Sequence, residues 1–75
     1  MNAKDKKIIE DAERENIPIF VFTAKDKYSP AAIREYYQNC VGGGTSQEHR
    51  KGIIDRHNEF TEWQDKHKHK VKIPD

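Results

Sequence analysis

Three consecutive glycines, Gly42 to Gly44, separate two segments of helical pattern in the second half of the chain. Glycine often follows a helix C-terminus, and three in a row let the backbone reverse tightly. Because the connection is this short, the flanking helices must lie side by side and antiparallel. The sequence therefore predicts a helical hairpin built from residues 30–41 and 46–67.

Capping residues and apolar spacing support both helices of this hairpin. Ser29 is a favoured N-cap residue, and Pro30 follows at the first helical position. The first helix then carries an apolar stripe at helical spacing, formed by Ile33, Tyr36, Tyr37, Cys40 and Val41. Thr45 or Ser46 can cap the second helix, whose predicted inner face consists of Ile53, His57, Phe60, Trp63 and His67.

Before the hairpin, the pattern changes from a helix to a short extended run. Residues 4–15 are good helix formers, and Asn16 and Pro18 end that helix. Residues 18–22 are apolar on both faces, which is typical of a strand buried on both sides. Such a strand needs a backbone partner, either residues 71–73 or the same strand of a second copy. We therefore expect a mostly α fold with one or two short β-strands, of the α+β class.

Composition favours an oligomer over an isolated chain. Only 33% of the 75 residues are hydrophobic and 36% are charged, so one small domain spanning residues 1–75 would have a marginal core. The single cysteine, Cys40, excludes an internal disulfide as a remedy and fits a reducing cytoplasm. No run is apolar enough for a signal peptide or a membrane span. We therefore expect a cytoplasmic homo-oligomer, a dimer or tetramer.

No constellation of catalytic or metal-binding residues stands out, and we expect a protein that is not an enzyme and uses no cofactor or metal. Cys40 lies on the apolar stripe, where a free thiol is more often packing than a nucleophile. The glycine triplet lacks the lysine of a phosphate-binding loop and follows a helix rather than a strand. His67 and His69 are a pair in a charged segment, whereas zinc sites need three or four ligands of defined spacing.

A candidate ligand site lies in residues 23–28, between the expected strand and the hairpin. A helix N-terminus offers free backbone N–H groups and positive potential, which suit phosphate. Cations near it could hold phosphate, polar groups could bond base edges, and aromatic rings could stack on bases. We assign these roles to Thr23, Lys25, Asp26, Lys27, Tyr28, Arg34, Tyr37 and His57. The alternative is a capped helix with solvated lysines and core tyrosines.

The stretch PIFVFTAKDKYSPAAIREYY resembles a pattern found in a group of small proteins, many of them encoded by phages. These read Pro, three or four apolar residues, a polar residue, Ala, a polar residue, Asp, and then a Pro-Ala helix start. The resemblance covers residues 17–63 and is carried by Pro18, Ala24, Asp26, Pro30, Ala31 and the pair Glu62-Trp63. Thr23 and Lys25 depart from the pattern, which has Arg and Gln there.

The group looks similar to anti-CBASS sponges, which sequester cyclic dinucleotide immune signals. The resemblance implies a phage anti-defence protein that binds a signal of the cyclic GMP-AMP type without catalysis, in the infected host's cytoplasm. It also implies a homo-oligomer with ligand pockets at subunit interfaces. Two other functions fit the residues: a protein-interaction module or inhibitor that docks on a host protein, and a weak nucleic-acid binder using the basic tail of residues 66–75. With a net charge of +1, we expect no stable nucleic-acid complex.

Overall fold

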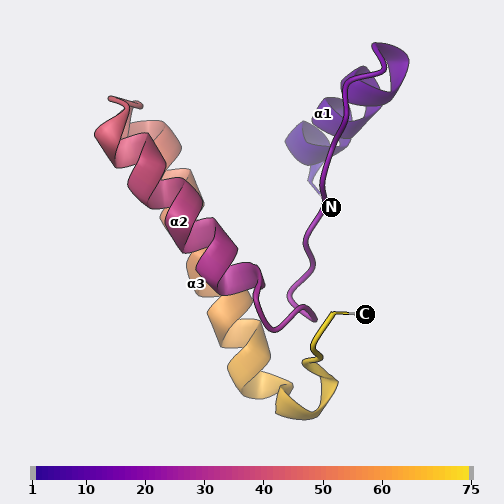
Figure 1. Ribbon diagram of the computed structural model, residues 1–75, viewed down its shortest axis with the longest axis vertical. Helices are drawn as coiled ribbons and strands as arrows, with labels where there is room; N and C mark the ends of the chain where they lie inside the picture. Colours follow the sequence, from indigo (N-terminus) through magenta and orange to yellow (C-terminus); the bar gives the residue numbers. More distant parts are fainter. Residues whose placement is uncertain (1, 75) are drawn as a thin grey trace.

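The computed structural model describes residues 2–74 and shows three α-helices (Figure 1). These are α1 (Ala3–Arg14), α2 (Ser29–Gly42) and α3 (Gln47–Lys66), followed by a short 3₁₀ turn, η1 (Lys68–Lys70). Residues 2–74 contain no β-sheet; a single isolated bridge joins Asp26 to Lys72 in parallel. Within the described part of the chain, no helix combines the length and apolar character needed to cross a membrane.

Helices α2 and α3 form the expected antiparallel hairpin and lie side by side along their length (Figure 1). The turn between them depends on Gly44, whose φ of 77° lies in the left-handed region. The N–H of Gly43 donates to the Asn39 carbonyl, and the N–H of Thr45 donates to the Cys40 carbonyl. These bonds satisfy carbonyls that the end of α2 would otherwise leave unpaired, as the glycine triplet predicted.

The N-termini of α2 and α3 differ in their capping. Ser46 caps α3, since its hydroxyl accepts the N–H of His49 at 3.2 Å. Ser29 was expected to cap α2 but lies inside the first turn, fully buried, and Tyr28 occupies the cap position without a side-chain bond. The Ser29 hydroxyl instead donates backward to the loop of residues 23–28.

The first helix ends in a reversal that sends the chain back along it (Figure 1). Asn16 adopts φ 56°, a left-handed conformation that asparagine tolerates. The N–H of Ile17 then donates to the Ala12 carbonyl at 2.8 Å, and the N–H of Asn16 donates to Glu13 at 3.3 Å. This is the Schellman pattern of helix termination, and it leaves Ala12 buried beside the returning chain.

The expected strand at residues 18–22 is wrong, because this segment is extended but pairs with nothing in the described chain. Ile19, Phe20 and Val21 are 50%, 82% and 62% exposed. Two apolar faces can both be buried only between two layers, and this segment has a layer on one side at most. The α+β class is therefore corrected to all-helical, and the homo-oligomer expected to pair this strand gains no support from the structure.

The candidate partner strand, residues 71–73, does form backbone bonds, but with a different segment. The N–H of Lys72 donates to the Lys25 carbonyl, and the N–H of Lys27 donates to the Lys72 carbonyl, both at 2.8 Å. The tail therefore returns from the end of α3 to the start of α2 and closes the open end of the hairpin.

The apolar core is small. Ala12 and Ile53 are the buried hydrophobic residues among those described, whereas many larger apolar side chains are half or more exposed. Helix α1 stands apart from the hairpin (Figure 1), and an ion pair between Asp5 and Arg56 joins it to α3. This separation creates the space in which a large cleft lies.

Candidate functional site

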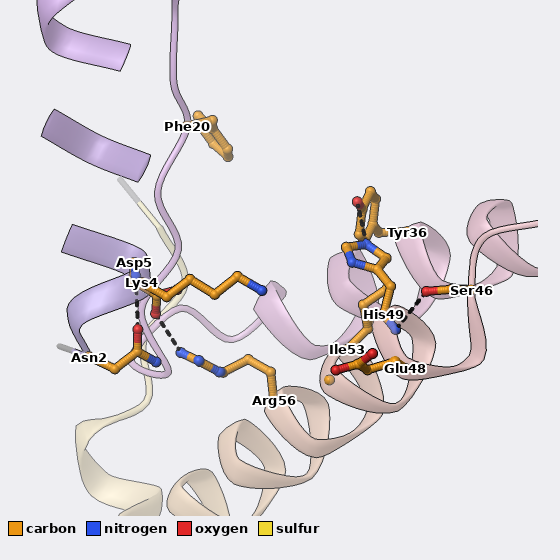
Figure 2. A pocket seen from close by; sticks show the side chains of 11 residues that line it. Asn2, Lys4, Asp5, Phe20, Tyr36, Ser46, Glu48, His49, Ile53 and Arg56 are labelled. Atoms are coloured by element: carbon orange, nitrogen blue, oxygen red, sulfur yellow. Dashed lines mark hydrogen bonds and ion pairs between the residues drawn. The ribbon is translucent and has the colours of Figure 1, made fainter. Parts of the chain in front are cut away.

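A large cleft lies between α1, the extended segment and the hairpin, and has a volume of about 720 Å³ (Figure 2). It is an open groove with cationic, aromatic and acidic side chains around it. The residues that line it come from all three helices and from the returning chain: Asn2, Lys4, Asp5, Phe20, Tyr36, Ser46, Glu48, His49, Gly52, Ile53 and Arg56.

Two cations enter the cleft from opposite sides. Lys4 extends from α1 toward the hairpin, and Arg56 extends from α3 toward α1 (Figure 2). The Arg56 guanidinium is held by Asp5 at 3.3 Å and by Glu59 at 3.4 Å, and its side chain is 44% exposed. Lys4 forms no ion pair within residues 2–74, so its ammonium group is available to a ligand.

Aromatic groups flank the same space. The Tyr36 hydroxyl and His49 Nε2 are 3.3 Å apart, and their rings meet edge to face. Phe20 lies across the cleft from them on the extended segment (Figure 2), steadied by an edge contact with Phe22 at a centroid distance of 4.8 Å. Phe20 is 82% exposed and Tyr36 is 53% exposed, so both rings are open to a ligand with flat faces.

Tyr36 keeps its proton throughout the physiological range. A hydrogen bond with the Cys40 side chain, then the charge of its thiolate form, and last burial raise the pKa of Tyr36 above its ordinary value of 10.0. The hydroxyl is therefore a neutral group at pH 7 that can donate or accept a hydrogen bond.

The acidic groups of the cleft limit which part of it can receive an anion. The carboxylate of Asp5 is neutralised by Arg56. Glu48 lies in the first turn of α3, where the helix dipole favours its negative charge. An anion would therefore be attracted most to the ammonium of Lys4, which has no ion pair within residues 2–74, and repelled from the side of Glu48.

The loop of residues 23–28, expected to bind a ligand, is occupied by bonds within the protein. The Ser29 hydroxyl donates to the carbonyls of Thr23 and Asp26 at 3.1 and 2.8 Å. Gln64 Nε2 donates to the carbonyls of Ala24 and Asp26 at 3.0 and 2.9 Å. The Asp26 carboxylate itself accepts the N–H of Tyr28 at 2.8 Å, which forms a tight local turn.

These bonds show that the loop connects α2, α3 and the tail, and its two lysine side chains nevertheless face solvent. Lys25 and Lys27 are exposed, as are Thr23 and Tyr28. Lys27 lines a groove of about 460 Å³ together with Gln64, Asp65, Lys68, Val71 and Ile73. None of the expected loop residues lines the large cleft.

The other three expected residues do come together. Arg34 and Tyr37 of α2 and His57 of α3 line a small cavity of about 80 Å³ with Ile53 and Ile54. His57 Nε2 is buried there without a hydrogen-bond partner. This volume suits one or two water molecules rather than a nucleotide, for which pockets of roughly 300–1,000 Å³ are usual.

Sequence reasoning missed the principal residues of the large cleft. The apolar run of residues 18–22 predicts Phe20 in a buried strand, and the helical spacing predicts Tyr36 on the packing stripe of α2. Lys4 and Arg56 stood in charged helical segments without a motif to distinguish them. The reversal at Asn16 turns the chain back and brings α1 opposite the hairpin. An asparagine after a helix is a weak sequence signal for such a reversal.

The chemistry of the cleft suits recognition of an anion that also has flat, apolar faces. Within residues 2–74, no group of three or more His, Cys, Asp and Glu side chains is placed to hold a metal ion. The chain matches no family model, no curated protein and no solved structure.

Proposed function

We propose that the protein binds and sequesters a cyclic dinucleotide in the cleft between α1 and the hairpin, without catalysis. The observation that carries this proposal is a cleft of about 720 Å³ into which Lys4 and Arg56 extend from opposite sides, with exposed aromatic rings flanking it. Such a volume lies within the usual range of roughly 300–1,000 Å³ for small-molecule sites.

Each part of a cyclic dinucleotide has a counterpart in this cleft. The two phosphodiesters carry negative charge, and the ammonium of Lys4 can pair with one of them. Arg56 is held by Asp5 and Glu59, and its remaining N–H donors can hydrogen-bond the other. The two bases have π-faces that can stack on Phe20 and Tyr36, and such stacking contributes about 1–3 kcal/mol per base. A ligand with two bases could stack one on each of these rings.

Sequestration requires affinity alone, which makes a binding cleft sufficient. The resemblance of residues 17–63 to phage-encoded sponges supports the biological role: removal of an immune signal of the cyclic GMP-AMP type inside an infected cell. The site that we propose differs from the one expected from the residues around the start of α2, since it uses the cleft instead of the loop of residues 23–28.

Calorimetric titration with a panel of cyclic dinucleotides tests the proposal. We expect saturable binding of at least one member, and a loss of at least about tenfold in affinity for Lys4→Ala and for Tyr36→Leu. Lys51→Ala is the matched control, because Lys51 is an exposed lysine of α3 paired with Asp55 outside the cleft. An absence of heat with every cyclic dinucleotide, or equal affinity for all four proteins, would overturn the proposal.

The exposed apolar run favours a second candidate function, docking on a host protein. Ile17, Ile19, Phe20 and Val21 are each at least half exposed on one extended segment, and contiguous apolar surface marks interaction sites. For this function, one stoichiometric partner should be retained by the wild type and by Val41→Ser but lost by Val21→Ser. Val41 is a suitable control, since it is 49% exposed on α2. Retention by all three proteins would contradict it.

A further inference from the structure

The tail pairing unites two basic segments that are far apart in the sequence. Lys25 and Lys27 flank Asp26, and the parallel bridge places this loop beside Lys72. Lys66, Lys68 and Lys70 precede Lys72 on the chain that leads into the bridge. All six lysines are exposed. We call these six residues the basic end of the protein.

The charge balance of the basic end differs from that of the whole chain. The loop of residues 25–27 and the stretch of residues 64–72 contain six lysines and only two acidic residues, Asp26 and Asp65, whereas the net charge of the protein is +1. The Asp26 carboxylate already accepts a backbone N–H, and Lys66 pairs with Glu62 on a solvent-exposed face of α3. The positive charge is therefore concentrated at one end of the molecule.

A groove lies on the surface of the basic end. Lys27 and Lys68, which are 41 positions apart in the sequence, line the same groove of about 460 Å³. Apolar Val71 and Ile73 form part of its wall, and Asp65 is the one carboxylate among the described residues that line it. A polyanion lying in this groove would meet both Lys27 and Lys68.

We propose that the basic end binds the phosphate backbone of nucleic acid weakly and without sequence preference. Its cations are all lysines, which act as point charges, whereas recognition of individual carboxylates favours the fork of arginine. A nucleic-acid strand supplies a closely and evenly spaced row of charges whose counterions are released on binding. This surface is separate from the cyclic dinucleotide cleft, and the inference does not rest on that function.

Fluorescence anisotropy with a short fluorescein-labelled DNA duplex tests the inference on the full chain. We expect binding at low salt that weakens about 40-fold between roughly 50 and 200 mM salt, as about three phosphate contacts would give. Lys27→Ala and Lys68→Ala should each lower the slope of this salt dependence by about one. Asp65→Asn should tighten binding, because it removes the groove's carboxylate.

A pair of substitutions at Lys72 tests whether the two segments act as one surface. Lys72→Ala removes a charge only, whereas Lys72→Pro also removes the N–H that donates to the Lys25 carbonyl. We expect Lys72→Pro to bind DNA at least about threefold more weakly than Lys72→Ala. Lys51→Ala controls for the loss of any surface lysine.

Three results would overturn the inference. The first is no binding of DNA at low salt by the wild type. The second is an equal loss of affinity in Lys51→Ala and Lys27→Ala, which would show a diffuse charge effect. The third is competition by poly-glutamate as strong as competition by unlabelled DNA, which would assign the surface to acidic proteins. None of these results bears on cyclic dinucleotide binding, whose variants lie in the cleft.

Discussion

The carboxylate of Asp5 lies 3.3 Å from the guanidinium of Arg56, and this is the one polar side-chain contact between α1 and α3 within residues 2–74. The side chains are 34% and 44% exposed, so solvent screens the pair and its contribution to stability is at most about 1 kcal/mol. The position of α1, and with it the width of the large cleft, depends on this weak link.

We expect Asp5→Asn to loosen α1 without unfolding the hairpin. The amides of α1 should exchange with deuterium faster, while those of α3 keep their protection, because the pair holds α1 against its neighbour. Hydrogen exchange followed by mass spectrometry measures this. Asp55→Asn is the control, since it breaks a pair internal to α3. Unchanged exchange in α1 would show that the ion pair does not position the helix.

Ser29→Ala should destabilise the protein by about 1–1.5 kcal/mol. The residue is fully buried, and its hydroxyl donates to the carbonyls of Thr23 and Asp26. Both carbonyls have other donors, which holds the loss near the lower end of the range for a broken buried hydrogen bond. Urea denaturation monitored by circular dichroism gives the value. Gln38→Ala at an exposed position of α2 should leave stability nearly unchanged.

Substitution by alanine should change stability in opposite directions at two glycines of the triplet, Gly42 and Gly44. Gly44→Ala forces a Cβ into a backbone with φ 77° and should cost about 1–2 kcal/mol. Gly42→Ala lies at the end of α2, where an added Cβ meets nothing within 4 Å, and should stabilise by up to about 1 kcal/mol. Thermal unfolding of both variants checks the pair, and a shift of Tm in the same direction for both would contradict the turn geometry.

Tyr36 should make stability depend on pH at the alkaline end. Because the folded protein raises the pKa of Tyr36 above 10.0, the folded state holds this proton more tightly than the unfolded state does. The protonated Tyr36 therefore contributes fully to the stability of the folded state below pH 10. This contribution is lost as pH rises through the higher pKa that Tyr36 has in the folded state. Denaturation at a series of alkaline pH values should therefore show a smaller decrease for Tyr36→Phe than for the wild type. An equal decrease in both proteins would exclude Tyr36 as the cause.

The helical hairpin could be predicted because its signals are local. The glycine triplet, Ser46 as a cap and the apolar stripes each act over a few residues, and the helices lie within one residue of the predicted bounds of 30–41 and 46–67. The prediction of a strand at residues 18–22 was wrong for the opposite reason. An apolar run such as residues 18–22 is the same in a buried sheet and in an exposed segment, and only long-range packing decides between them.

The candidate cleft could not be predicted from spacing. Lys4, Phe20 and Arg56 belong to three separate segments, which the reversal at Asn16 brings to one space. The loop of residues 23–28 has a helix start and nearby lysines, which fit a ligand site or an ordinary capped helix, but Gln64 and Lys72 approach from the far end of the chain and take its carbonyls. A distant partner of this kind leaves no mark in the sequence of the loop itself.

The pairing of Lys72 with Lys25 and Lys27 means that the chain enters and leaves the hairpin at the same point. A unit whose two ends meet can be inserted into a surface loop of another protein with little distortion of either, as in natural domain insertions. Residues 25–72 could thus be transplanted as a cassette, and the glycine turn at the opposite end would be the place to open new termini by circular permutation.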